Sequence, residues 1–92
     1  MNTTIAEDAR SRAFRYLLGK LSERETEIFK RIAQGESAAD IARTLGLTHS
    51  TVSTYRRRIL TKLHQRSNAD LTVIAYRLGI IEAPDLYETV SK

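Results

Sequence analysis

The chain has 92 residues, of which 41% are hydrophobic and 28% charged, and it carries a formal net charge of +4. This length suits one domain with a modest core and excludes a deep catalytic cleft supported by further layers of structure. The chain has no cysteine, which excludes disulfides and thiolate metal sites, and it has no apolar run of about 18 residues that would predict a transmembrane helix. The first eight residues lack the apolar stretch of a signal peptide, so we expect a soluble, cytoplasmic protein.

Hydrophobic residues recur at intervals of three to four along most of the chain, which predicts an all-α fold. Four main helices are expected over residues 22–34, 37–45, 49–63 and 68–79. Their apolar stripes are Ile28, Phe29, Ile32 and Ala33; Ile41, Ala42 and Leu45; Val52, Ile59, Leu60 and Leu63; and Leu71, Ile74, Ala75 and Leu78. A further turn or helix, packed beside Leu21, is predicted from the preceding residues Phe14, Tyr16, Leu17 and Leu18.

The starts and ends of these helices are marked by capping residues. Ser22 with Glu25 forms a capping-box pattern, in which each side chain binds the other residue's backbone amide. The same pattern recurs at residues 37–40 and 67–70 with aspartate in the last position, and Thr48 is the expected N-cap of the helix between them. Gly35 and Gly46 stand where left-handed C-caps are needed.

Positive charge is concentrated in the middle of the sequence. Between Asp40 and Asp70 there is no acidic residue, while six basic residues occur there: Arg43, Arg56, Arg57, Arg58, Lys62 and Arg66. The remainder of the chain has nine basic and eleven acidic residues. Such segregation favours a polyanionic partner, nucleic acid first, although a basic solvated helix face would show the same pattern.

Residues 38–57 have the pattern of a helix-turn-helix. Ala42 is small where the two helices would cross, and Gly46 supplies the positive φ that the turn needs. The angle between the helices would be filled by Ile41, Leu45, Leu47, Val52 and, in part, Tyr55. A simple antiparallel helix pair is the structural alternative.

The predicted helix over residues 49–63 divides into an apolar and a polar face. A helix with a narrow, polar and positive outer face can enter the major groove of DNA. Ser53, Thr54 and Arg57 are placed to reach base edges, because they lie near the N-terminal half of this face, and an arginine there can read guanine. Contacts to the phosphate backbone are expected from Ser50, Thr51, Tyr55, Arg56, Arg58 and Lys62.

The order and spacing of several short blocks resemble the LuxR-type (NarL/FixJ-like) DNA-binding domain of transcription regulators. The blocks are Leu21-Ser22-Glu23-Arg24-Glu25, Ile32-Ala33-Gln34-Gly35, Asp40-Ile41-Ala42, Thr51-Val52-Ser53-Thr54-Tyr55-Arg56 and Leu63. The resemblance implies a four-helix domain whose third helix reads DNA through Ser53, Thr54 and Arg57. Members often have lysine where Ser53 stands and histidine where Tyr55 stands.

The resemblance also implies a domain organisation and partners. Residues 21–80 would form the DNA-binding domain, residues 1–20 an N-terminal extension or linker, and residues 81–92 a C-terminal tail. LuxR-type domains are usually the output of a receiver or sensor domain, as in two-component response regulators. A free-standing LuxR-type regulator is the alternative, and RNA polymerase is a further possible partner. A homodimer through the fourth helix is implied. Its interface would use the apolar residues in this region that are not needed to close the core, namely Val73, Tyr76 and Ile80. Packing of these residues against the terminal segments is the alternative.

Other classes of function fit the sequence less well. An enzyme would need a nucleophile with a base or paired carboxylates in a cleft, but the two histidines, His49 and His64, stand at expected helix ends. No metal-ligand cluster or glycine-rich phosphate loop occurs, so neither an enzyme nor a cofactor is expected. Region four of a sigma factor is a competing interpretation, as is a protein-interaction module that keeps the helix-turn-helix shape without binding DNA.

Overall fold

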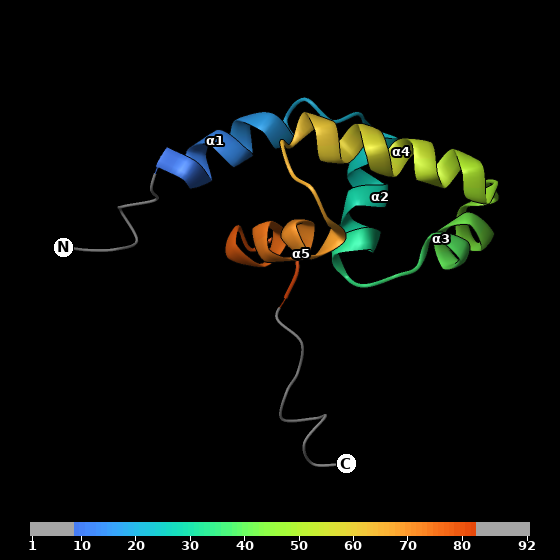
Figure 1. Cartoon of the computed structure of the whole chain (residues 1–92). Coiled ribbons are helices and arrows are strands. Elements are labelled where there is room, and N and C mark those ends of the chain that lie inside the picture. Colours follow the sequence, from blue (N-terminus) through green and yellow to red (C-terminus); the bar gives the residue numbers. More distant parts are fainter. Residues whose placement is uncertain (1–8, 83–92) are drawn as a thin grey trace, which may run out of the picture.

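The computed structural model describes residues 9–82, and within this range the chain forms five α-helices and no strand (Figure 1). In chain order the helices are α1 (Ala9–Leu18), α2 (Glu23–Ala33), α3 (Ala38–Leu45), α4 (His49–Lys62) and α5 (Asn68–Arg77). The expected four-helix domain with a helical N-terminal extension is confirmed. The helix over residues 68–79 is two residues shorter than expected, because Leu78 is its C-cap and Gly79 takes a positive φ of 73°.

The predicted N-caps are formed at α2, α3, α4 and α5. The Ser22 hydroxyl accepts from the Glu25 amide at 3.0 Å, and the Ser22 amide donates to Glu25 Oε1 at 2.9 Å. Ser67 and Asp70 make the same reciprocal pair at the start of α5. At α3 only half of the box forms, because the Asp40 carboxylate instead accepts from Arg43 at 2.7 Å.

The chain turns at left-handed residues after α2, α3 and α4. Gly35 and Gly46 have φ values of 95° and 69°, and the Gly46 amide donates to the carbonyl of Ala42 as the C-cap of α3. His64, directly after the C-cap of α4, also has a positive φ, of 58°, which no pattern in the sequence indicated. Histidine is one of the residues, with asparagine and aspartate, that occur more often than other non-glycine residues in this region.

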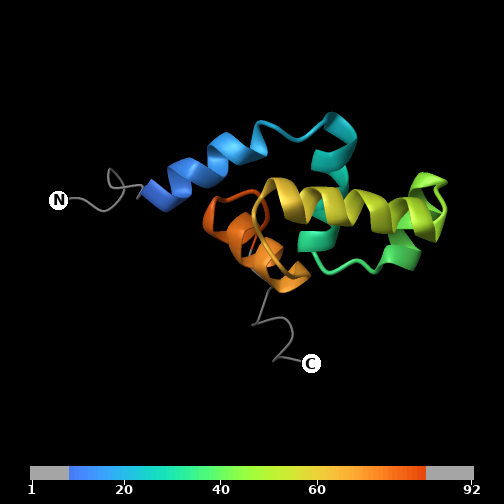
Figure 2. The ribbon, with the colours of Figure 1, turned by 45° about the horizontal axis from the view of Figure 1, so that its top comes forward.

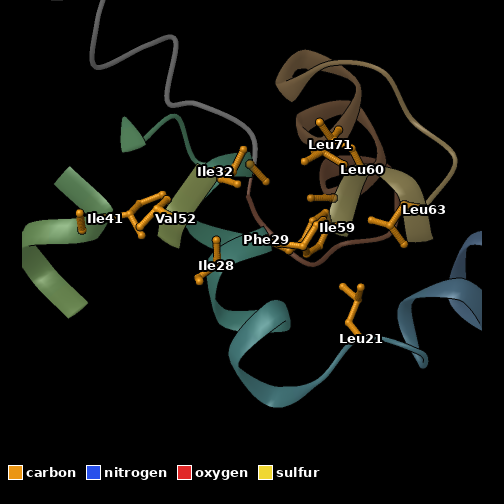
Figure 3. Packing of buried hydrophobic residues seen from close by; sticks show 13 residues of the cluster. Leu21, Ile28, Phe29, Ile32, Ile41, Val52, Ile59, Leu60, Leu63 and Leu71 are labelled. Carbon is orange, nitrogen blue, oxygen red and sulfur yellow. The ribbon is translucent and has the colours of Figure 1, made fainter. Parts of the chain in front are cut away.

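Helix α2 is the centre of the domain, since α3, α4 and α5 all pack against it. Figure 3 shows Ile28, Phe29 and Ile32 of this helix pointing toward residues of the other three. The buried core is Leu21, Ile28, Phe29, Ile32, Ala33, Ile41, Ala42, Val52, Ile59, Leu60, Leu63, Leu71, Ile74 and Ala75. All of the predicted stripe residues are buried except Leu45 and Leu78, which are half-buried at helix ends.

Helix α1 lies at one end of the molecule and is attached mainly through its last turn. Leu17 and Leu18 pack against the core, whereas Tyr16 is 66% exposed, so only part of the predicted hydrophobic group packs inward. Figure 1 shows α1 extending away from α2 with α5 below it. Of the predicted tail over residues 81–92, all but the first two residues lie outside the described part of the chain.

Candidate nucleic-acid interface

Helix α4 is fixed to the domain along one face only. Its inner side buries Val52, Ile59 and Leu60 against the core, and the helix packs on α2 and α3. In Figure 2, α4 crosses in front of α2, with α3 beside its N-terminal end. The opposite face of α4 is therefore open to solvent, as a groove-binding helix requires.

The three residues predicted to contact bases lie within one turn of this helix. Ser53 and Thr54 are half-buried, while Arg57 is exposed. Within residues 9–82, the guanidinium of Arg57 makes no hydrogen bond or ion pair. An arginine beside two short hydroxyl side chains can extend its five donors into a groove without a steric barrier.

The predicted phosphate-contact residues differ in their exposure and in the hydrogen bonds that they make within the protein. Ser50 and Arg58 are exposed, whereas the Tyr55 ring packs partly against the core. Arg56 Nε donates to Asn68 Oδ1 at 2.6 Å, which ties α4 to the first turn of α5 and leaves the terminal amino groups of the guanidinium for other acceptors. The Thr51 hydroxyl accepts from Thr48 at 2.9 Å and can still donate its own hydrogen.

Lys62 has a role inside the protein that the sequence did not reveal. Its Nζ lies 2.7 Å from Glu25 Oε1, and it also donates to the carbonyl of Lys20 at 3.4 Å. Glu25 is the one buried charged residue within residues 9–82. The ion pair joins residues 37 positions apart in the sequence, so no local pattern could have indicated it.

The Glu25 carboxylate is held in its charged form by these partners. Burial by itself would raise its pKa, but the hydrogen bond from Lys62, the backbone amide of Ser22, the charge of Lys62 and the Ser22 hydroxyl together lower the pKa below its ordinary value. The ammonium of Lys62 therefore serves first to neutralise a buried carboxylate. A contact between Lys62 and DNA phosphate would have to compete with this pair.

The remaining ionisable groups near α4 include Arg43 and Asp40 of α3 and the two histidines. Arg43 is exposed and paired with Asp40, whose pKa is lowered by the Arg43 hydrogen bond, the Ser37 hydroxyl and the Arg43 charge. His49 and His64 are both exposed. Within residues 9–82, no group of His, Cys, Asp or Glu side chains is placed to hold a metal ion.

The residues predicted for the dimer interface differ in exposure. Val73 and Tyr76 on α5 are 48% and 55% exposed. Ile80, beyond the end of α5, is half-buried and packs against the core. The apolar surface that α5 offers to another molecule is therefore centred on Val73 and Tyr76.

Comparison with known families matches residues 19–80 to a family described as bacterial regulatory proteins, luxR family. These residues include helices α2 to α5 and therefore the whole helix-turn-helix. The family consists of regulatory proteins and not of enzymes, which confirms the expectation that the chain is not an enzyme. None of the helices within residues 9–82 is long and apolar enough to cross a bilayer.

Several curated proteins are similar over the same region. The chain is 44% identical over 55 residues to the transcriptional regulatory protein TdiR of Thauera aromatica, and 38% identical over 66 residues to the response regulator UvrY of Escherichia coli (strain K12). It is 43% identical over 61 residues to the virulence factors putative positive transcription regulator BvgA of Bordetella pertussis. These matches cover 60%, 72% and 66% of the chain but only 24%, 30% and 29% of the relatives, so the chain corresponds to less than a third of each.

The fold, the open polar face of α4 and these comparisons agree with one another. The chain belongs to the LuxR family of bacterial regulatory proteins, and it is a DNA-binding transcription-regulator domain related to those of response regulators.

Proposed function

We propose that this domain recognises specific DNA sites by placing the outer face of α4 in the major groove. The base contacts would come from Ser53, Thr54 and Arg57. The observation that carries this proposal is Arg57, an exposed arginine with no partner within residues 9–82, on the face of α4 opposite the core. A guanidinium in this position can donate two parallel hydrogen bonds to O6 and N7 of a guanine.

Contacts to phosphates would set the register of the helix without reading sequence. Ser50, Thr51, Tyr55, Arg56 and Arg58 are the proposed donors. Arg56 fits this role through its terminal amino groups, because its Nε is used by Asn68. Lys62 would join them only by giving up part of its pairing with Glu25.

The test is to measure the affinity of Arg57→Ala for a selected site and for random DNA at the same salt concentration. Loss of a bidentate base contact should weaken binding to the selected site by about 1–3 kcal/mol and change binding to random DNA much less. Arg58→Ala is the matched control, because Arg58 is also exposed and is proposed to contact phosphate. An equal loss on both kinds of DNA for Arg57→Ala would show that Arg57 is itself a phosphate contact.

The proposed assembly is a homodimer through α5, with Val73 and Tyr76 at its centre and Ile80 at its edge. The exposed apolar area is small, so the dimer would be weak and would be strengthened by binding two half-sites. Half-sites about 10 base pairs apart are expected for a symmetric pair of groove-binding helices. Tyr76→Arg should reduce cooperative binding to a two-half-site duplex and leave binding to one half-site intact; a footprint over one half-site by the parent chain would argue for a monomer.

The wider setting follows from the relatives. Since UvrY is named a response regulator, we propose that the domain over residues 21–80 acts as the output domain of a two-component regulator in the cytoplasm. Residues 1–20 would then belong to the linker or extension before it, and residues 81–92 to the tail. RNA polymerase is the further partner proposed for transcription control.

A further inference from the structure

Helix α1 and the turn after it carry a cationic stripe, by which we mean Arg12, Tyr16 and Lys20. Arg12 and Tyr16 are four residues apart, which places them on one side of α1, and Lys20 follows in the turn after it. All three are exposed, Tyr16 to 66%, and Lys20 Nζ lies 4.8 Å from the centre of the Tyr16 ring. The segment from Ala9 to Ser22 contains four basic residues and no acidic one.

The cationic stripe faces away from the rest of the domain. Arg10, Ser11 and Phe14 of α1 line a groove of about 360 Å³ together with residues of α5. Since positions two residues apart lie on nearly opposite sides of a helix, Arg12 and Tyr16 point away from the groove that contains Phe14. The groove side of α1 thus faces α5, and the cationic stripe forms its outer side.

The cationic stripe is joined to the C-terminal end of α4. Lys62, the last residue of α4, donates to the carbonyl of Lys20, and so holds the end of α1 beside the end of α4. In Figure 1, α1 and α4 lie along the same side of the molecule, with α5 below α1 and α3 below α4. Helix α1 therefore extends, beyond the C-terminal end of α4, the side of the molecule on which α4 lies.

We propose that the cationic stripe binds DNA phosphates flanking the recognised site, beyond the C-terminal end of α4. This inference rests on the proposed function of α4 and extends the interface that α4 forms. Arginine, lysine and a tyrosine hydroxyl are all donors found at phosphate oxygens. A ten-residue helix is about 15 Å long, which is enough to follow the backbone past the groove that α4 occupies.

The experiment compares salt dependence of binding for the parent chain and for Arg12→Gln/Lys20→Gln, on a duplex selected from a random pool. Each phosphate contact steepens the slope of log affinity against log salt by about 0.9. The double variant should therefore have a slope about 1.8 smaller per protomer, so that between about 50 and 200 mM salt the parent loses about twelvefold more affinity. The control is Arg24→Gln/Lys30→Gln, which removes two exposed charges from α2.

A duplex truncated at the edge of the recognised site gives the second measurement. On this shorter duplex the parent and Arg12→Gln/Lys20→Gln should bind alike, because the flanking phosphates are gone. The proposal is overturned if Arg12→Gln/Lys20→Gln has the same slope as the α2 control on the long duplex while Arg57→Ala loses specific binding as expected. A parent chain that binds no duplex even in low salt overturns both this inference and the proposed function of α4.

Discussion

Substitution of Gly46 isolates the energetic cost of the turn between α3 and α4. This residue has a φ of 69° and a ψ of 34°, and a Cβ placed on it would meet no atom within 4 Å. An alanine at this position therefore creates no steric clash with the rest of the described chain. Any loss of stability must come from the backbone conformation itself.

The expected losses follow from the strain of the left-handed region. An L-residue is disfavoured there by about 1–2 kcal/mol. Replacing glycine also lowers the conformational entropy of the unfolded chain, which stabilises the folded state by about 0.4–1 kcal/mol. Gly46→Ala should thus lower the free energy of unfolding by about 1 kcal/mol, which is about 4–8 °C in melting temperature for a domain of this size. Gly46→Asn should cost less, because asparagine tolerates this region, and the β-branched Gly46→Val should cost more.

Thermal unfolding followed by circular dichroism ranks the variants by melting temperature. Gly35→Ala is the matched control, because Gly35 also has a positive φ, of 95°, and open space where a Cβ would lie, but is outside the helix-turn-helix. Both alanine variants should lose similar stability, and each should keep the base preference of the parent chain once folded. Equal melting temperatures for glycine, alanine and valine at position 46 would refute the assignment of backbone strain to this turn.

Three further predictions concern residues whose environment the fold determines. Lys62→Met should destabilise the domain by removing the partner of the buried Glu25 carboxylate, whereas a DNA-binding loss at unchanged stability would place Lys62 at a phosphate instead. The pKa of Glu25 is lowered in the folded state, so its contribution to stability is present above the ordinary value of 4.5 and is lost as pH falls through the folded-state pKa. Urea unfolding between about pH 7 and 3 should therefore show a smaller acid-induced loss of unfolding free energy for Lys62→Met than for the parent chain. His64→Gly should raise the free energy of unfolding by up to about 1 kcal/mol by relieving its positive φ, and a lower melting temperature would show that the histidine side chain contributes more than the strain costs.

The local features of this protein follow from its sequence because they depend on neighbouring residues. The N-caps Ser22 and Ser67, the left-handed Gly46 and the apolar stripe of α2 are each defined within about one or two helical turns, where short-range hydrogen bonding and periodicity operate. The resemblance to the LuxR-type domain rested on the same short blocks, and the family match over residues 19–80 confirmed it.

The features that the sequence did not reveal all depend on residues brought together by packing. The pairing of Lys62 with Glu25 and of Arg56 with Asn68 requires α4 to lie beside the starts of α2 and α5. A basic side chain on a helix looks the same in the sequence whether its charge is neutralised by the protein or left to a partner. Only the tertiary structure separates these two cases. Lys62 is held by the buried Glu25 carboxylate, because an unpaired buried charge would be costly. Arg57, on the outer face of α4, meets no acidic group within residues 9–82.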